Sequence, residues 1–150
     1  MLEFAKGAIR EQEWVGIFKL LDHYDIQNVI EFGSGMSTKC FYESNLDVVS
    51  FETNAYWKHK VEKECSAKII LWDNQNFPVE YLDSHFDLAF VDGKAPRHNQ
   101  TRVARIVSDK ILFHDGRRKQ ETEMILELMQ DWKEVFHRDM LKGGLRLFVR

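Results

Sequence analysis

The stretch from Val29 to Thr38, which reads VIEFGSGMST, restricts the possible folds more than any other part of the chain. Its beginning is an apolar run typical of a buried strand, and Glu31 places a carboxylate near the end of that strand. Gly33 and Gly35 lack a Cβ atom, so the backbone there can turn tightly and lie close to a ligand. The helix predicted to follow presents unpaired N–H groups at the same place. The stretch therefore predicts a strand, a glycine turn and a helix that together form a ligand-binding unit.

The rest of the chain alternates short apolar strands with amphipathic helices. Strands are predicted at 29–32, 47–52, 68–72, 86–91, 110–114, 132–138 and 145–149, and helices at 8–24, 37–43, 54–65, 99–108 and 119–131. Apolar strands that alternate with helices indicate a parallel sheet covered on both faces. Too few residues join the last two strands for a parallel crossover, so this pair is predicted to be antiparallel.

Composition and length favour one domain over residues 1–150, because 44% hydrophobic and 13% aromatic residues are enough for a core. The net charge of −3 does not indicate general nucleic-acid binding. Cys40 and Cys65 are too few for a disulfide framework and indicate reduced thiols. No apolar run approaches the ~20 residues of a membrane span, and no signal-peptide pattern is present. We therefore expect a cytoplasmic protein, and the sequence leaves open whether it forms a homo-oligomer.

An acidic residue stands at, or within one residue of, the end of each predicted parallel strand. These residues are Glu31, Glu52, Asp73, Asp92 and Asp115. The carboxyl ends of parallel strands meet at one edge of a sheet, where ligands bind at the switch point. Like charges crowded along one rim are unfavourable. The series of acids therefore predicts that a cationic ligand or a metal ion binds among them.

The acid and glycine turn of this chain resemble motif I of the class I S-adenosylmethionine (SAM)-dependent methyltransferases, which reads acid-apolar-Gly-x-Gly. The strand–helix units and the antiparallel ending are similar to the same family over nearly the whole chain. The resemblance implies an α/β fold, a Rossmann-like three-layer sandwich. Its seven-stranded, mostly parallel sheet would have the order 3-2-1-4-5-7-6, with strand 7 antiparallel. The resemblance also implies a SAM-dependent methyltransferase, with S-adenosylhomocysteine (SAH) as the product of its cofactor.

Several positions of the chain match cofactor-binding positions of this family. They are Glu31, Gly33, Ser34, Gly35, Glu52, Thr53, Asp73, Asn74 and Asp92. By resemblance, Glu31 would help hold the ammonium group of SAM, and Glu52 would accept from the ribose hydroxyls. Asp73 would accept from the adenine amino group, and Asp92 would lie near the transferring methyl group.

The residues after the fourth and fifth strands bear on the chemistry of the acceptor. Methyl transfer is an in-line displacement in which the protein mainly aligns nucleophile and methyl group. A hydroxyl or amine nucleophile also loses a proton, so a nearby base helps. The candidates for this base are Asp92, Lys94, His98 and His114, of which Asp92, Lys94 and His114 are the predicted catalytic residues. The tetrapeptide typical of amino-methyltransferases is absent, since the sequence reads Asp92-Gly93-Lys94-Ala95. This favours an unidentified small molecule methylated at oxygen.

The same segments are similar to the catechol O-methyltransferase-like group, where acids after strands four and five bind a divalent ion. Here Asp92 and His114-Asp115 occupy those segments. An asparagine normally follows the second acid in that group, but this chain has Gly116, which removes one oxygen ligand. The sequence therefore favours a site without a metal ion, and it leaves open whether a divalent ion whose shell is completed by water binds at Asp92 and Asp115.

Two other functions stay open for the same fold. One is a SAM-binding or scaffold module without turnover, and the other is a nicotinamide-dependent oxidoreductase. Dinucleotide sites have a third glycine that allows close packing of helix and strand next to a pyrophosphate. Thr38 stands at that position here, which favours SAM over a dinucleotide.

Overall fold

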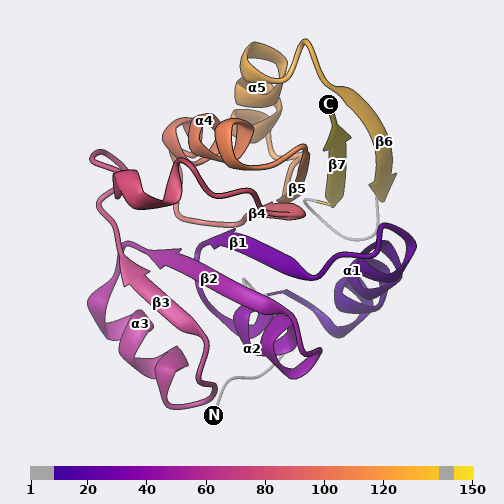
Figure 1. Ribbon diagram of the computed structural model, residues 1–150. Coiled ribbons are helices and arrows are strands. Elements are labelled where there is room, and N and C mark those ends of the chain that lie inside the picture. The colour runs from indigo at the N-terminus through magenta and orange to yellow at the C-terminus, as the bar shows by residue number, and fades with distance from the viewer. Residues whose placement is uncertain (1–8, 139–143) are drawn as a thin grey trace.

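The computed structural model describes residues 9–138 and 144–150, and it shows one sheet with helices on both faces (Figure 1). The elements are α1 (Glu11–His23), β1 (Asn28–Phe32), α2 (Met36–Glu43), β2 (Asp47–Glu52), α3 (Ala55–Glu62), β3 (Lys68–Leu71), η1 (Val79–Tyr81), β4 (Leu88–Val91), α4 (His98–Val107), β5 (Lys110–His114), α5 (Lys119–Leu128), β6 (Lys133–Arg138) and β7 (Leu145–Val149). The 7-stranded sheet has the order β3-β2-β1-β4-β5-β7-β6. Strands β1 to β5 are parallel, and β7 is antiparallel to both β5 and β6. The predicted fold class and strand order are confirmed.

Some element boundaries differ from the prediction. Helices α3 and α5 end earlier than predicted, at Glu62 and Leu128, and β4 begins later, at Leu88. Apolar residues just beyond these boundaries are still buried, since Phe86 is 7% and Met129 is 2% exposed. Apolar periodicity indicates burial and not backbone hydrogen bonding, so it extends past the true end of an element. Helix α1 begins at Glu11, later than predicted, since residues 9 and 10 precede it; residue 8, the predicted start, lies outside the described residues.

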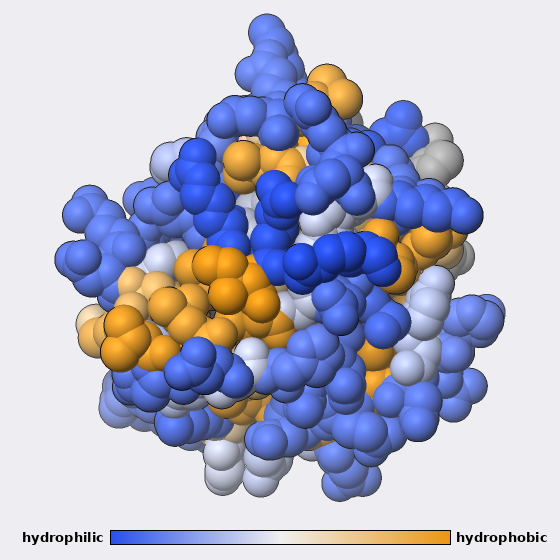
Figure 2. Space-filling view, turned by 45° about the horizontal axis from the view of Figure 1, so that its top comes forward, coloured by the Kyte–Doolittle hydropathy of each residue, from blue (hydrophilic) through white to orange (hydrophobic). Residues whose placement is uncertain are grey.

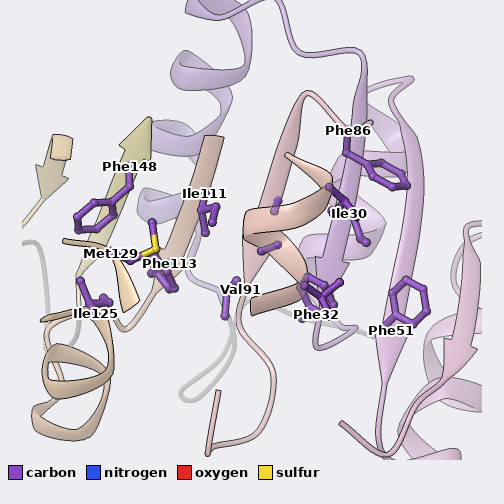
Figure 3. Close-up of a cluster of buried hydrophobic side chains, with 14 of the residues drawn as sticks. Ile30, Phe32, Phe51, Phe86, Val91, Ile111, Phe113, Ile125, Met129 and Phe148 are labelled. Atoms are coloured by element: carbon purple, nitrogen blue, oxygen red, sulfur yellow. The ribbon is translucent and has the colours of Figure 1, made fainter. Parts of the chain in front are cut away.

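Two apolar clusters fill the two faces of the sheet and decide where the polar residues of β1 lie. Ile30 and Phe32 belong to the cluster under α4 and α5 (Figure 3), whereas Val29 belongs to the cluster under α1 and α2. Successive side chains of a strand point to opposite faces. Glu31 therefore lies on the face that α2 covers.

Hydrophilic residues cover most of the surface seen in Figure 2, with an apolar group toward the left of that view. In the described part of the chain, no helix has both the length and the apolar character that a membrane span requires. Cys40 and Cys65 are free and buried, which confirms the prediction of unpaired thiols.

Candidate active site

A cavity of about 190 Å³ lies where β1, β2 and β4 end, between the turns that follow these strands. Strand β1 is the neighbour of both β2 and β4, so this is the switch point of the sheet, where ligands of open parallel sheets bind. The predicted site residues that line the cavity are Gly33, Ser34, Gly35, Glu52, Asp92 and Lys94. The structure therefore brings together residues from three separate segments of the chain.

The two glycines of the turn after β1 serve different purposes. Gly33 has a φ of +95°, and a Cβ atom there would lie 2.6 Å from the Cα atom of Gly93. This position needs glycine because the turns after β1 and β4 cross in backbone contact. Gly35 has an extended φ of 174°, and a Cβ atom there would be 3.6 Å from Nε1 of Trp57, an ordinary contact. Gly35 therefore keeps space open beside a residue that lines the cavity.

The Glu52 carboxylate joins the turns after β1 and β2. Its Oε2 accepts hydrogen bonds from the backbone N–H (2.9 Å) and the hydroxyl (3.1 Å) of Ser34, and its Oε1 accepts from the N–H of Asn54 (2.9 Å). Thr53 Oγ1 also donates to Oε1, at the long distance of 3.5 Å. Three close hydrogen bonds and one long one therefore orient the carboxylate, and the long one occupies the weakest of its about four lone-pair positions. Thr53, predicted beside it, does not line the cavity.

Glu31 does not reach the cavity. It is fully buried, and its carboxylate accepts hydrogen bonds from the hydroxyls of Ser37, Thr38 and Ser50, the last at 2.7 Å. Burial raises the pKa of Glu31 to about 7, against the lowering effect of these hydrogen bonds. The structure gives no support for the predicted contact with an ammonium group. Glu31 instead attaches the first turn of α2 to β1 and β2.

Asp73 and Asn74, predicted to lie near adenine, form a turn of their own outside the cavity. Asp73 Oδ1 accepts from the backbone N–H groups of Gln75 (2.9 Å) and Asn76 (3.3 Å). Asn74 has a φ of 64°, and its carbonyl oxygen accepts from Asn99 at 2.6 Å. These are the ordinary contacts of turn residues, and neither residue lines the cavity.

His114 is buried behind Asp92 and is surrounded by carboxylates. Its Nδ1 lies 2.7 Å from Asp92 Oδ1, and its Nε2 lies 3.1 Å from Glu13 Oε2. Burial alone lowers the pKa of His114, but Asp92, Glu13 and Asp115 outweigh it and raise the pKa to about 10. An imidazolium has no lone pair with which to take a proton. The structure therefore gives no support for His114 as a general base.

The acids after β4 and β5 are paired with cations of the chain itself. Arg97 is 6% exposed, and its Nη2 lies 3.4 Å from Asp92 Oδ1. Arg118 Nη2 lies 2.6 Å from Asp115 Oδ2. The prediction that crowded rim acids need an external cation is therefore wrong for Asp92 and Asp115.

Sequence reasoning missed several residues of the site. Glu13 is an acid on the apolar face of α1, four residues before the buried Ile17, and that position is a usable signal. Trp57, within the helix predicted at 54–65, lines the cavity, and its indole N–H donates to the Ser34 carbonyl. Arg97 has no signal in the sequence, because its partners come together only in the folded chain.

Comparisons with solved structures identify the fold of the chain. No family model and no curated protein sequence matches the chain. A SAH-bound methyltransferase from Podospora anserina superposes with a TM-score of 0.75 at 14% identity, covering 96% of this chain and 80% of that chain. An O-methyltransferase from Bacillus cereus in complex with SAH superposes with a TM-score of 0.73 at 13% identity, covering 98% of this chain and 84% of that chain. The O-methyltransferase TomG from Streptomyces achromogenes in complex with SAM superposes with a TM-score of 0.72 at 12% identity, covering 95% of this chain and 81% of that chain. The chain therefore has the fold of the class I SAM-dependent methyltransferases.

Proposed function

We propose that the chain is a SAM-dependent methyltransferase that methylates an oxygen atom of a small molecule. The observation that carries the proposal is the single cavity that Gly33, Gly35, Glu52 and Asp92 share at the switch point of this sheet. Solved structures with the same fold include O-methyltransferases that hold SAM or SAH, which supports both the cofactor and the choice of oxygen.

The residues around the cavity fit the chemistry of SAM. Glu52 is an oriented acceptor for the ribose hydroxyls, and Gly35 leaves room beside Trp57. When bound, SAM supplies an electrophilic methyl group on a sulfonium. The cavity is smaller than the ~300–1,000 Å³ of typical ligand pockets, so part of SAM would extend beyond it.

Two polar groups that line the cavity can act on the acceptor. Asp92 presents a carboxylate whose Oδ1 is fixed by His114, and Lys94 lies two residues further along the same loop. In this proposal Asp92 accepts the proton or a hydrogen bond of the acceptor hydroxyl, and Lys94 holds the acceptor in place. Both roles are forms of positioning next to the reacting methyl group.

Calorimetry with SAM and SAH, followed by methyl transfer from labelled SAM to phenols, hydroxy acids and amines, tests the proposal. We expect SAM and SAH to bind and at least one hydroxyl compound to be labelled. Binding without turnover of any acceptor would instead support a SAM-binding or scaffold module. Tight binding of NADH without binding of SAM would establish the oxidoreductase alternative and exclude the methyltransferase.

Changing Glu52 to glutamine is expected to weaken SAM binding by about 1–3 kcal/mol, roughly 5- to 150-fold, because it removes a charged acceptor for the ribose. Glu62→Gln is the matched control, since Glu62 lies on the surface of α3 and pairs with Lys58. Calorimetry gives the affinity of each variant, and urea denaturation shows whether each is folded. Equal SAM affinity in folded Glu52→Gln and wild-type protein would place Glu52 outside the site.

A further inference from the structure

Three side chains connect α1 to the cavity in an unbroken series of hydrogen bonds. Glu13 of α1 is 5% exposed, His114 at the end of β5 is 3% exposed, and Asp92 lines the cavity. His114 contacts one carboxylate through each ring nitrogen, Glu13 at 3.1 Å and Asp92 at 2.7 Å. The two acids lie on segments far apart in the sequence, so the series exists only in the folded chain.

The geometry of this series determines the charge of the ring. An ionised carboxylate only accepts hydrogen bonds, so a ring that contacts carboxylates through both nitrogens donates from both. His114 is then an imidazolium, and it neutralises charge between the buried Glu13 and the partly buried Asp92. It also fixes Asp92 Oδ1, which Arg97 approaches from another direction at 3.4 Å.

We propose that Glu13 and His114 are positioning residues of the proposed methyltransferase site. The His114 imidazolium, held by Glu13, orients the Asp92 carboxylate toward the acceptor and is the resident cation of the site, in the place of a divalent metal ion. This inference rests on the proposed function for its kinetic consequence, but the state of His114 can be measured without it.

A metal ion does not fit the cluster as the chain has built it. Ligand atoms of Asp92, His114 and Asp115 lie within 4.8 Å of one another, a spacing that by itself suits an ion. A metal ligand must be deprotonated, however, and Nδ1 of His114 already bonds Asp92. Arg118 holds Asp115 at 2.6 Å, so an ion would also lie beside a guanidinium. Gly116 also stands where the catechol O-methyltransferase-like group, which the sequence resembles here, has an asparagine ligand.

Glu13 makes a helix-capping hydrogen bond, which needs no charge, and it contacts His114 from the apolar face of α1. Burial of an unpaired carboxylate is unfavourable, and an apolar side chain of similar volume often stabilises a helix contact as well or better. Its Oε2 also accepts from the Arg10 backbone N–H at 2.8 Å, an interaction that glutamine can keep. The negative charge of Glu13 therefore acts on His114. The variant Glu13→Gln removes this charge and keeps the size of the side chain, so it tests the effect of the charge on the ring.

Nitrogen NMR of the His114 ring at pH 8, above the ordinary histidine pKa of about 6.5, tests the inference in the wild-type protein. We expect both ring nitrogens to be protonated. We expect the neutral form to appear in Glu13→Gln but not in Glu11→Gln, which alters an exposed glutamate of the same helix. A neutral ring in wild-type protein would overturn the proposal.

Manganese ions provide a second readout that does not depend on activity. Millimolar Mn²⁺ should leave the backbone signals of Asp92, His114 and Asp115 no more broadened than those of exposed acids. Selective broadening there, with loss of a ring proton from His114, would overturn the resident-cation proposal.

Kinetics provide the third readout once an acceptor is known. Glu13→Gln should lower kcat roughly 10- to 100-fold, as expected when a reacting group is misplaced, with KM for SAM nearly unchanged. Glu11→Gln should leave both values as they are. Unchanged kcat in Glu13→Gln would overturn the positioning role. Failure of the wild-type protein to bind SAM would instead contradict the proposed function, and the NMR result would still decide the state of His114.

Discussion

Replacing Gly33 with alanine is expected to destabilise the protein by about 2–5 kcal/mol, through backbone strain and overpacking together. The strain arises because Gly33 has a φ of +95°. The overpacking arises because the new methyl group would lie 2.6 Å from Gly93 Cα and 2.7 Å from the backbone carbonyl of Asp92. Backbone atoms of the β4 turn cannot move aside as a flexible side chain can. The change therefore damages the fold and the cavity together.

Gly35→Ala is the matched control for this experiment. Gly35 is extended, and a methyl group there meets only Trp57 at an ordinary contact distance. Its effect on stability should be below about 1 kcal/mol, although the methyl group narrows the cavity and should weaken SAM binding. Urea denaturation of both variants gives the comparison. Equal stability of the two variants would contradict the backbone contact between the turns after β1 and β4.

The unfolding free energy should fall by about 3 kcal/mol as pH rises from 4.5 to above 7, as a contribution of Glu31 alone. Burial raises the folded-state pKa of Glu31 from 4.5 to about 7. Between these values the folded protein holds a proton that the unfolded chain has released. The stabilisation is therefore complete below pH 4.5 and is lost as pH rises through the folded pKa.

The contribution is isolated by comparison with Glu31→Gln, which has no proton to release at this position. The difference in unfolding free energy between wild-type and Glu31→Gln protein should change by about 3 kcal/mol over this interval. His114, whose pKa is raised to about 10, affects both proteins equally and cancels. Glu11→Gln, at an exposed position, should follow the wild-type curve. Parallel curves for Glu31→Gln and wild-type protein would show that Glu31 is ionised in the folded state without penalty.

Local patterns were sufficient to predict the order of elements and the sheet. The strands Asp47–Glu52, Lys110–His114 and Leu145–Val149 have the predicted bounds, because apolar runs there end at charged or turn residues. The position of the cavity also followed from the sequence, since strand ends and the Gly33–Gly35 turn determine it. The ends of α3 and α5 could not be predicted from the sequence, because buried residues continue beyond the last helical hydrogen bond of each helix.

The partners of the site residues could not be predicted, because they depend on contacts between distant segments. Glu13 lies 101 positions from His114, and Arg97 reaches both Asp92 and the His114 carbonyl oxygen. The sequence shows the acids along the rim but not the cations that pair with them in the folded chain, so the rim was predicted to carry an uncompensated negative charge.

The alternation of side chains along β1 puts Glu31 on the face opposite Ile30 and Phe32. Because Val29 is also apolar, the sequence does not show which helix covers that face, and the clusters of the folded chain are needed to place Glu31 under α2.

A titration of ¹⁵N-labelled protein with SAH, followed by NMR, tests most directly whether the cavity is the cofactor site. The cavity-lining reporters are the backbone N–H groups of Ser34 and Gly35 and the indole N–H of Trp57. We predict that these signals shift together in a saturable manner, while those of Asn45 and Leu46, at the opposite ends of the strands, do not. Saturable binding whose shifts map away from Ser34, Gly35 and Trp57, or no binding to the folded protein, would contradict the account.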